Sequence, residues 1–419
     1  MKTILISIAA SSLLAALAIA QPSPRYTITD LGAVGPTGQP FFITINGLVS
    51  GAATFPDNTL HAVLWYKGQR LDIATPGLGG PNSMAIGVNQ WGQTVGEAET
   101  HSLDPKGEDF CGFAALGLHS FGTSCLPFLW QHGVMIPLPT LGGNNGVANQ
   151  INNRGEVAGM AENATTDANC PATAPQKLQF KPVVWVNGKI QELPTYLGDP
   201  DGAAFAVNDN GQVVGSSGDC TTFSPISLVN LLPLHALLWQ DGKVTDLGNL
   251  GGTGHGNGIE AVDLNNQGQV VGNSDLKGDT TFHGFLWTRH TGMQDLGTLP
   301  GDVNSTVTSI NDAGEVVGVS LDASFNPRAY LRRSGVMTDL NTLIPAGSPL
   351  FLLTACFINT RGEIIGIAVE TSTGDVHGYL ATPRNGGDPS ESLAPQDAQK
   401  LLEQRMHIGR LGAWLPGQR

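Results

Sequence analysis

Four histidines recur in a short apolar phrase, which reads HAVLW at 61–65, HALLW at 235–239, HGFLW at 283–287 and HGYLA at 377–381. Imidazole is a common metal ligand and hydrogen-bonding group, so these residues could contact a metal ion or a sugar. Residues that recur once per repeat unit lie in separate units, however, and are too far apart to converge on one ligand. We therefore expect each histidine to hydrogen-bond to a neighbouring loop within its own unit.

Tryptophans and aspartates recur in step with these histidines. The large apolar rings are expected to pack between units, where their burial is most favourable. These are Trp65, Trp130, Trp185, Trp239 and Trp287. The aspartates are expected to stabilise turns through hydrogen bonds to backbone N–H groups. These are Asp30, Asp72, Asp246, Asp295 and Asp339.

Acidic residues that do not recur are better candidates for chemistry. Five of them, Glu97, Glu99, Asp104, Glu108 and Asp109, lie in or beside one long insertion. Two carboxyl groups facing each other could act as acid and base in glycoside hydrolysis. The Asp199-Pro-Asp201 turn could supply two oxygens to Ca²⁺, but it also fits an ordinary solvated turn. No other cofactor is indicated, and the sequence contains no G-x-S-x-G, H-E-x-x-H or P-loop motif.

The elements that position these residues belong to an internal repeat. One phrase recurs as VNQWGQTVGE (88–97), INNRGEVAGM (151–160), VNDNGQVVGS (207–216), LNNQGQVVGN (264–273), INDAGEVVGV (310–319) and INTRGEIIGI (358–367), with a shortened copy, INGLVSGA, at 45–52. We align the copies on seven asparagines, namely Asn46, Asn89, Asn152, Asn208, Asn265, Asn311 and Asn359. The spacing of roughly 50 residues is typical of β-propeller blades.

Each unit has the pattern of four short strands separated by tight turns. The fourth strand is found in the first six units, and the seventh unit, which ends at 377–384, lacks one. A spare copy, YTITDLG at 26–32, precedes the first unit. A closed ring explains both facts, because the N-terminal strand would complete the last blade and leave no open edge. The sequence therefore predicts an all-β, seven-bladed propeller rather than a linear solenoid, which would need capping units.

The phrases DLGNLGG (246–252), INDAGEVVG (310–318) and HAVLW resemble the HAF-type extracellular repeat of exported bacterial proteins. The resemblance covers roughly residues 26–383. It implies an exported repeat protein and no particular activity, because the repeat alone defines the family. Pro127, Pro182 and Arg328 replace the histidine in three copies, and Arg332 replaces the tryptophan in the sixth.

Strand order predicts that one face of the disc carries the larger loops. The Asn-x-x-Gly turns and the third-to-fourth turns share one face, and the crossover loops share the other. Long insertions at 97–126, 161–181 and 217–234 also fall on the crossover face, where binding groups concentrate on a rigid scaffold. The candidate ligand-binding residues on this face are Asn82, Glu97, Glu99, Asn144, Asn145, Asp199, Asp201, His255, Asn257, Asp302 and Asn304.

Four of the five cysteines lie in the insertions. We predict that Cys111 pairs with Cys125 and Cys170 with Cys220, which would fix the loops. A zinc site is not expected, because no C-x-x-C spacing occurs. Cys356 falls in a predicted innermost strand and is expected to be a buried apolar residue.

Composition and the two ends of the chain bound the setting. The net charge of −14 argues against a nucleic-acid partner. Residues 1–20 have the pattern of a bacterial signal peptide, with Lys2, an apolar run and a small-x-small cleavage site. A membrane anchor fits less well because the run is short, and the mature chain has no later run long enough to span. The propeller is expected over 21–384, a linker over 385–393, and a helical or disordered tail over 394–419.

Three functional hypotheses follow for a secreted, extracellular or periplasmic chain. The first is a non-enzymatic propeller that binds a small ligand, a glycan or a protein through the insertion-bearing face. The second is a polysaccharide hydrolase or lyase on the same scaffold. The third is a purely structural cell-surface protein. The absence of a catalytic motif favours the first.

Overall fold

The structure is a computed structural model that describes residues 26–384 except 36, 172–173, 175 and 221–230. The predicted signal peptide, linker and C-terminal tail lie outside the described residues. Among the helices of the described part, none is long and apolar enough to cross a membrane. A single 3₁₀ turn, η1 (Leu340–Thr342), is the one helix described, and everything else regular is β-strand.

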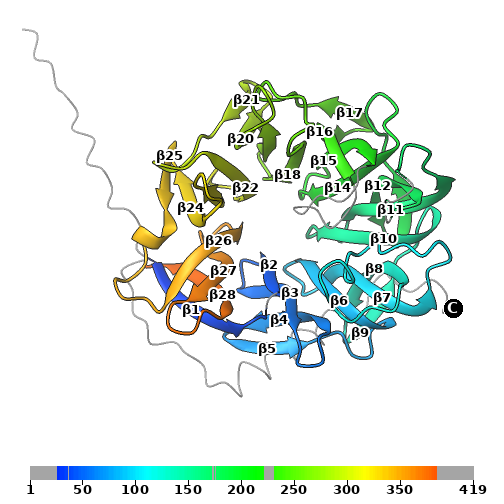
Figure 1. Ribbon diagram of the computed structural model, residues 1–419, viewed down its shortest axis with the longest axis horizontal. Helices are drawn as coiled ribbons and strands as arrows, with labels where there is room; N and C mark the ends of the chain where they lie inside the picture. The colour runs from blue at the N-terminus through cyan, green and yellow to red at the C-terminus, as the bar shows by residue number, and fades with distance from the viewer. Residues whose placement is uncertain (1–25, 36, 172–173, 175, 221–230, 385–419) are drawn as a thin grey trace, which may run out of the picture.

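Seven four-stranded antiparallel sheets surround a central axis, as predicted (Figure 1). Blade 1 contains β2 (Gln39–Ile43), β3 (Leu48–Thr54), β4 (Leu60–Tyr66) and β5 (Gln69–Asp72). Blade 2 contains β6 (Gly79–Val88), β7 (Thr94–Leu103), β8 (Thr123–Gln131) and β9 (Val134–Pro137). Blade 3 contains β10 (Gly142–Ile151), β11 (Val157–Thr166), β12 (Leu178–Val186) and β13 (Lys189–Glu192). Blade 4 contains β14 (Asp201–Val207), β15 (Val213–Cys220), β16 (Leu231–Gln240) and β17 (Lys243–Asp246).

The remaining three blades follow the same order from the axis outward. Blade 5 contains β18 (Ile259–Leu264), β19 (Val270–Asp275), β20 (Phe282–Thr288) and β21 (Gly292–Asp295). Blade 6 contains β22 (Asn304–Ile310), β23 (Val316–Leu321), β24 (Pro327–Arg333) and β25 (Val336–Asp339). Blade 7 contains β26 (Leu350–Ile358), β27 (Ile364–Glu370), β28 (Val376–Pro383) and the N-terminal β1 (Tyr26–Ala33).

Strand β1 closes the ring in the way that the strand count predicted. It pairs antiparallel with β28, with Thr27 opposite Thr382 and Ile28 opposite Ala381. Tyr26 at its start is fully buried among residues of blades 6 and 7. The ring is therefore closed by two strands from opposite ends of the described chain.

The hydrophobic core lies between the faces of adjacent blades. Trp185 is fully buried with Val95 and Leu129 of the preceding blade, and its indole N–H donates to Pro139 O at 2.9 Å. Close approach of the strands requires glycine behind this ring. A Cβ added at Gly159 would lie 2.1 Å from a backbone oxygen and 2.7 Å from the Trp185 ring. These contacts explain why Gly and Trp recur in step in the sequence.

A ring of hydrogen bonds links the Asn-x-x-Gly turns of neighbouring blades. Each anchor amide donates to the backbone oxygen of the next anchor residue at 3.0–3.1 Å, from Asn89 through Asn152, Asn208, Asn265 and Asn311 to Asn359. Asn359 then donates to Thr44 O at 3.0 Å. The first anchor is therefore Thr44, and the alignment on Asn46 was wrong by two residues. The Thr44 side chain lacks an amide, so it makes only the local bond from Leu48 N.

The repeated histidines pair with the repeated aspartates inside their own blades. His61 lies 2.8 Å from Asp72, His283 lies 2.8 Å from Asp295, and the His377 Nδ1 lies 2.9 Å from Asp30 across the closing pair of strands. In the sixth blade Arg328 takes the place of histidine and contacts Asp339. These pairs lie in separate blades, as expected, and hold the third strand to the fourth.

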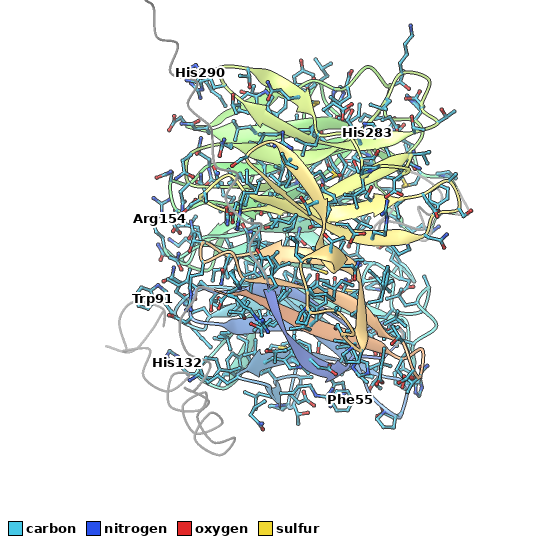
Figure 2. All side chains as sticks on the ribbon, turned by 90° about the vertical axis from the view of Figure 1, so that its left-hand side faces the viewer. Phe55, Trp91, His132, Arg154, His283 and His290 are labelled. Atoms are coloured by element: carbon cyan, nitrogen blue, oxygen red, sulfur yellow. A yellow bond between two sulfur atoms is a disulfide. The ribbon has the colours of Figure 1, made fainter. Side chains whose placement is uncertain are left out.

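The two faces of the disc have the loops that strand order predicted. Figure 2 shows the turn residues Trp91, His132, Arg154 and His290 on one face, and Phe55 with His283 on the other. We call the first the turn face and the second the insertion face, which carries the crossover loops and the described parts of the three long insertions.

Candidate functional site

We call the described residues of the three insertions, which lie within 97–126, 161–181 and 217–234 on three neighbouring blades, the wall. Strands β7, β11 and β16 each have 10 residues, whereas the equivalent strands β19, β23 and β24 have six or seven. Both predicted disulfides are present. Cys111–Cys125 lies within the blade 2 insertion, and Cys170–Cys220 joins the blade 3 insertion to strand β15 of blade 4. The wall is thus anchored covalently both within and between blades.

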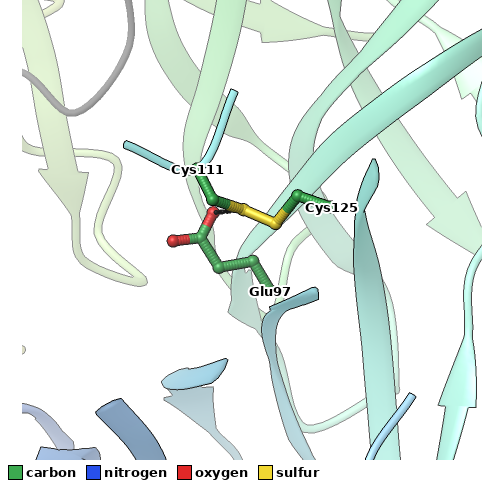
Figure 3. A group of neighbouring side chains, drawn as sticks. All are labelled: Glu97, Cys111 and Cys125. Atoms are coloured by element: carbon green, nitrogen blue, oxygen red, sulfur yellow. Dashed lines mark hydrogen bonds between the residues drawn. A yellow bond between two sulfur atoms is a disulfide. The ribbon is translucent and has the colours of Figure 1, made fainter. Parts of the chain in front are cut away.

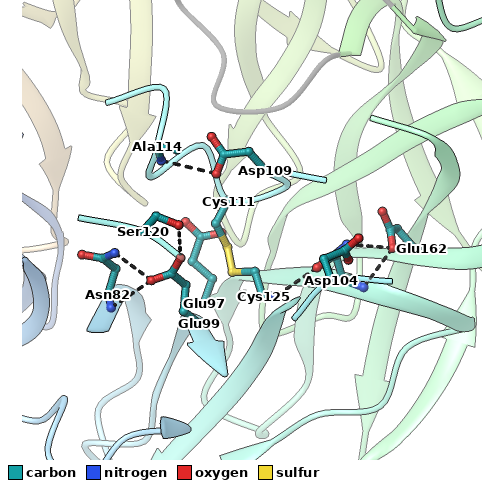
Figure 4. Close-up of a disulfide and its surroundings, with 11 residues drawn as sticks. Asn82, Glu97, Glu99, Asp104, Asp109, Cys111, Ala114, Ser120, Cys125 and Glu162 are labelled. Carbon is teal, nitrogen blue, oxygen red and sulfur yellow. Dashed lines mark hydrogen bonds between the residues drawn. A yellow bond between two sulfur atoms is a disulfide. The ribbon is translucent and has the colours of Figure 1, made fainter. Parts of the chain in front are cut away.

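Carboxylates inside the wall hold its loops in place. Glu99 is 2% exposed and accepts hydrogen bonds from the Asn82 amide at 2.7 Å and the Ser120 hydroxyl at 2.5 Å (Figure 4). Glu162 is fully buried and accepts from Asn145 through both its backbone N–H and its amide. These groups are occupied by the protein and do not face solvent.

Glu97 lies against the first disulfide. Its Oε2 is 3.0 Å from Cys111 Sγ, and its side chain is enclosed beside the Cys111–Cys125 bond (Figure 3). Burial, with Asp109 and Glu99 nearby, raises the pKa of Glu97 well above its usual range. Because a disulfide sulfur carries no hydrogen, the contact is favourable only when the carboxyl group is itself protonated.

Two pairs of carboxyl groups also lie in the wall. Glu108 Oε2 and Glu162 Oε1 are buried without another hydrogen-bond partner, and burial together with Glu108 raises the pKa of Glu162 to about 8. Asp201 interacts with Asp167 in the same manner, and burial raises the pKa of Asp201 to about 8. Each pair is stable with a shared proton, because two buried like charges cannot both ionise at close range.

Most of the predicted ligand-binding residues support the backbone. Asn82, Asn145, Asp201 and Asn304 are buried, and each accepts a backbone N–H from the preceding blade at 2.8–3.1 Å. The other loop residues bond as follows: Asn257 to Asp275, His255 to Thr253, Asp199 to Ser217 and Asp302 to Arg328. The Asp199 and Asp201 carboxylates thus have different protein donors. The predicted role of these residues in ligand binding stays a prediction.

Of the predicted ligand-binding residues, Asn144 lines an open groove. The groove has a volume of about 420 Å³ on the insertion face, and most of its lining belongs to the blade 2 insertion. Leu103 on its edge is 71% exposed. The residues that line it are Leu78, Thr100, His101, Ser102, Leu103, Pro105, Ser124, Leu126, Pro137 and Asn144. None of these described residues is Asp, Glu, Lys or Arg, so the groove offers neutral hydrogen-bonding groups and apolar surface.

A second cavity, of about 140 Å³, lies at the turn-face end of the central channel. Its wall includes the side chains two residues before the anchors, such as Phe42, Gln150, Asp263 and Phe357. The sequence analysis placed the candidate binding residues on the crossover face and did not anticipate this cavity. The signal in the sequence was the variation at this position, which is Phe, Gly, Gln, Ala, Asp, Ser and Phe in successive blades.

One partly exposed group of side chains could hold a cation. Ligand atoms of Glu370, Asp375 and His377 lie within 4.8 Å of one another on the insertion face. The His377 Nδ1 is bonded to Asp30, and its Nε2 lies 3.9 Å from Glu370 Oε2 within the group. Two similar groups include the disulfide cysteines, which have no thiolate to offer a metal.

The fold and these sites together define a seven-bladed β-propeller with a disulfide-anchored wall on one face. No protein-family model and no curated sequence matches the chain. Among solved structures, a puromycin-hydrolysing peptidase of Mycobacterium tuberculosis is 12% identical, with a TM-score of 0.47 over 85% of this chain and 56% of that one. TolB from Acinetobacter baumannii is also 12% identical, with a TM-score of 0.39 over 85% of this chain and 80% of TolB.

A fungal lectin from Aleuria aurantia, described as a six-bladed β-propeller, is 7% identical. Its TM-score is 0.33 over 88% of this chain and 98% of the lectin. The chain spans little more than half the length of the peptidase. None of these similarities bears on what this chain binds.

Proposed function

We propose that the protein is a non-enzymatic binding protein that holds a neutral oligosaccharide in the groove on its insertion face. The observation that carries the proposal is the chemistry of the groove. Hydroxyl groups of Ser102 and Ser124 and the Asn144 amide can hydrogen-bond to sugar hydroxyls, while Leu103 offers apolar surface to sugar C–H groups. A volume of 420 Å³ is within the range of about 300–1,000 Å³ that is usual for ligand sites.

The arrangement of carboxyl groups disfavours the hydrolase alternative. A glycosidase needs two carboxyl groups on either side of a bond in the substrate. Glu97 and Glu99 are each 2% exposed and bonded to or packed against the wall, so no substrate bond can lie between them. The carboxylates of the wall thus form a scaffold for the groove.

Export is part of the proposal. The two disulfides are stable in an oxidising compartment, which agrees with a secreted, extracellular or periplasmic chain. We also infer membership of the HAF-type repeat proteins from the repeated phrases. Mass spectrometry of the chain after expression in a bacterial host tests export directly, because removal of residues 1–20 is expected and retention of them would contradict it.

Binding is tested with an array of neutral oligosaccharides and the purified mature chain. Sugars that bind on the array are then titrated calorimetrically into the Leu103→Ser and His101→Ala variants, in which we expect binding to weaken at least fivefold. The matched control is Val134→Ser, since Val134 is an apolar residue 56% exposed on the turn face. Absence of any neutral ligand, or equal effects of the control, would refute the site. Cleavage of a bound sugar would refute the non-enzymatic assignment.

A further inference from the structure

The channel cavity on the turn face differs chemically from the groove and is separate from it. Its walls come from the C-terminal ends of the innermost strands and from the turns that follow them in all seven blades. Among its described lining residues there are three aspartates, Asp209, Asp263 and Asp312, and there is no Lys, Arg or His. The cavity therefore has acidic groups with no cationic side chain to balance them.

Asp263 is the buried acid of this cavity. It is 4% exposed and accepts from the Ser309 hydroxyl at 2.7 Å and from the backbone N–H groups of Leu264 at 2.9 Å and Ile310 at 3.1 Å. All of these donors are neutral dipoles. Burial raises the pKa of Asp263 to about 6, so the group is ionised at neutral pH and its charge has no counter-ion within the described wall.

Neighbouring blades keep this carboxylate at the cavity wall. Gln150 of blade 3 accepts from Val207 N at 2.7 Å and extends toward Asp263, with its Nε2 3.5 Å from the Asp263 Oδ1. It crosses blade 4 because Ala206, at the equivalent position there, has only a methyl group. Gln150 thus faces the acid with a neutral amide at the limit of hydrogen-bonding distance and does not neutralise it.

Two aromatic rings lie on the other side of the cavity. Phe42 of β2 and Phe357 of β26 have ring centroids 3.8 Å apart and come from blades 1 and 7. Figure 1 shows β2 across the central opening from β18, which carries Asp263, with β26 beside β2. Both rings are half-buried and line the cavity. The cavity is consequently acidic on one side and aromatic on the other.

We propose that this cavity binds a small organic cation, with its ammonium group directed to Asp263 and its carbon atoms against Phe42 and Phe357. A buried carboxylate without a counter-ion supplies the charge complement. Aromatic faces favour alkylated ammonium groups over strongly hydrated inorganic ions. The volume of 140 Å³ limits the ligand to a small molecule and excludes a polymer segment.

The test uses choline and its uncharged isostere, 3,3-dimethylbutan-1-ol, titrated calorimetrically into the purified chain in 150 mM NaCl. The proposal predicts that choline binds and that the alcohol binds at least tenfold more weakly. Equal binding of the two compounds, or no binding of choline, would overturn it. This comparison uses the unaltered protein and does not depend on the folding of any variant.

Two variants locate the site. Asp263→Asn should weaken choline binding at least tenfold, and Phe357→Leu should weaken it about fivefold. The matched control is Asp322→Asn, a partly exposed aspartate in a loop of the insertion face, which should leave affinity unchanged. Thermal melting checks that each variant is folded. Choline affinity that is unchanged in both folded cavity variants would place the binding elsewhere and refute the proposal.

Discussion

The hydrogen-bonded ring of anchor residues has one missing link, and the chain itself supplies the test. Asn208 Nδ2 donates to Gln212 Oε1 at 2.8 Å and to Asn265 O at 3.0 Å, and its Oδ1 accepts from Asn210 N and Gln212 N at 3.0 Å each. The Thr44 side chain keeps only the acceptor bond, in which its hydroxyl oxygen accepts from Leu48 N. Asn208→Thr therefore converts a complete anchor into the natural incomplete one, and Thr44→Asn does the reverse.

The expected magnitudes follow from the number of bonds changed. Asn208→Thr removes both donor bonds of a side chain that is 5% exposed, so at about 1 kcal/mol for each bond it should lower the free energy of unfolding by about 2 kcal/mol. Thr44→Asn adds one inter-blade donor to Asn89 O and should raise the free energy of unfolding by about 1 kcal/mol. Opposite signs from reciprocal changes are the specific feature of this prediction.

Urea unfolding monitored by tryptophan fluorescence measures both changes. Asn249→Thr is the matched control, because Asn249 lies in an exposed loop and makes only a local bond to Gly251 N. It should change the free energy of unfolding by less than about 0.5 kcal/mol. A destabilising Thr44→Asn, or an Asn208→Thr no more costly than the control, would show that the inter-blade ring contributes nothing to stability.

Three further predictions concern the wall and the core. Replacing Cys170 and Cys220 together by serine opens a loop with a sequence separation of 50. Calorimetry should show that the free energy of unfolding falls by about 4 kcal/mol. No loss would mean that the bridge does not constrain the unfolded chain. Burial raises the folded-state pKa of Glu162 to about 8, above its unfolded value. The contribution of the protonated group to the free energy of unfolding is therefore fully present below the unfolded pKa and is lost as pH rises through about 8. Glu162→Gln should thus melt higher than the wild type at pH 8.5 with little difference at pH 5, and parallel pH profiles would contradict the shared proton. Gly159→Ala should abolish folding or cost more than about 3 kcal/mol by urea unfolding, since its Cβ would meet a backbone oxygen; a near-neutral effect would be inconsistent with that close approach.

The architecture could be predicted because the number of repeat copies and their spacing determine it. Seven copies of the anchor phrase indicated seven blades, and the spare fourth strand at 26–32 predicted its pairing with the last blade. The one error in alignment arose at the first unit. There Thr44 takes the anchor position and Asn46, two residues later, resembles it in residue type.

The candidate sites were harder to predict because burial is a property of the assembled ring. Glu97 and Glu99 lie in a polar insertion and have the sequence signature of exposed acids, yet both are enclosed by the wall. The channel cavity depends on Phe42, Asp263 and Phe357, which lie in three separate blades and meet only after closure. In the sequence, each looks like an ordinary deviation from the repeat.

Closure of the ring by β1 is the claim on which both sites depend. Hydrogen exchange of the purified chain, read by mass spectrometry on peptides covering 26–33 and 376–383, measures it most directly. A closed ring predicts that 26–33 exchanges as slowly as the outermost strands of the other blades and 376–383 as slowly as their third strands, because the amides of β1 and β28 bond to each other. Rapid exchange at 26–33 beside protected outermost strands in the other blades would contradict a closed propeller.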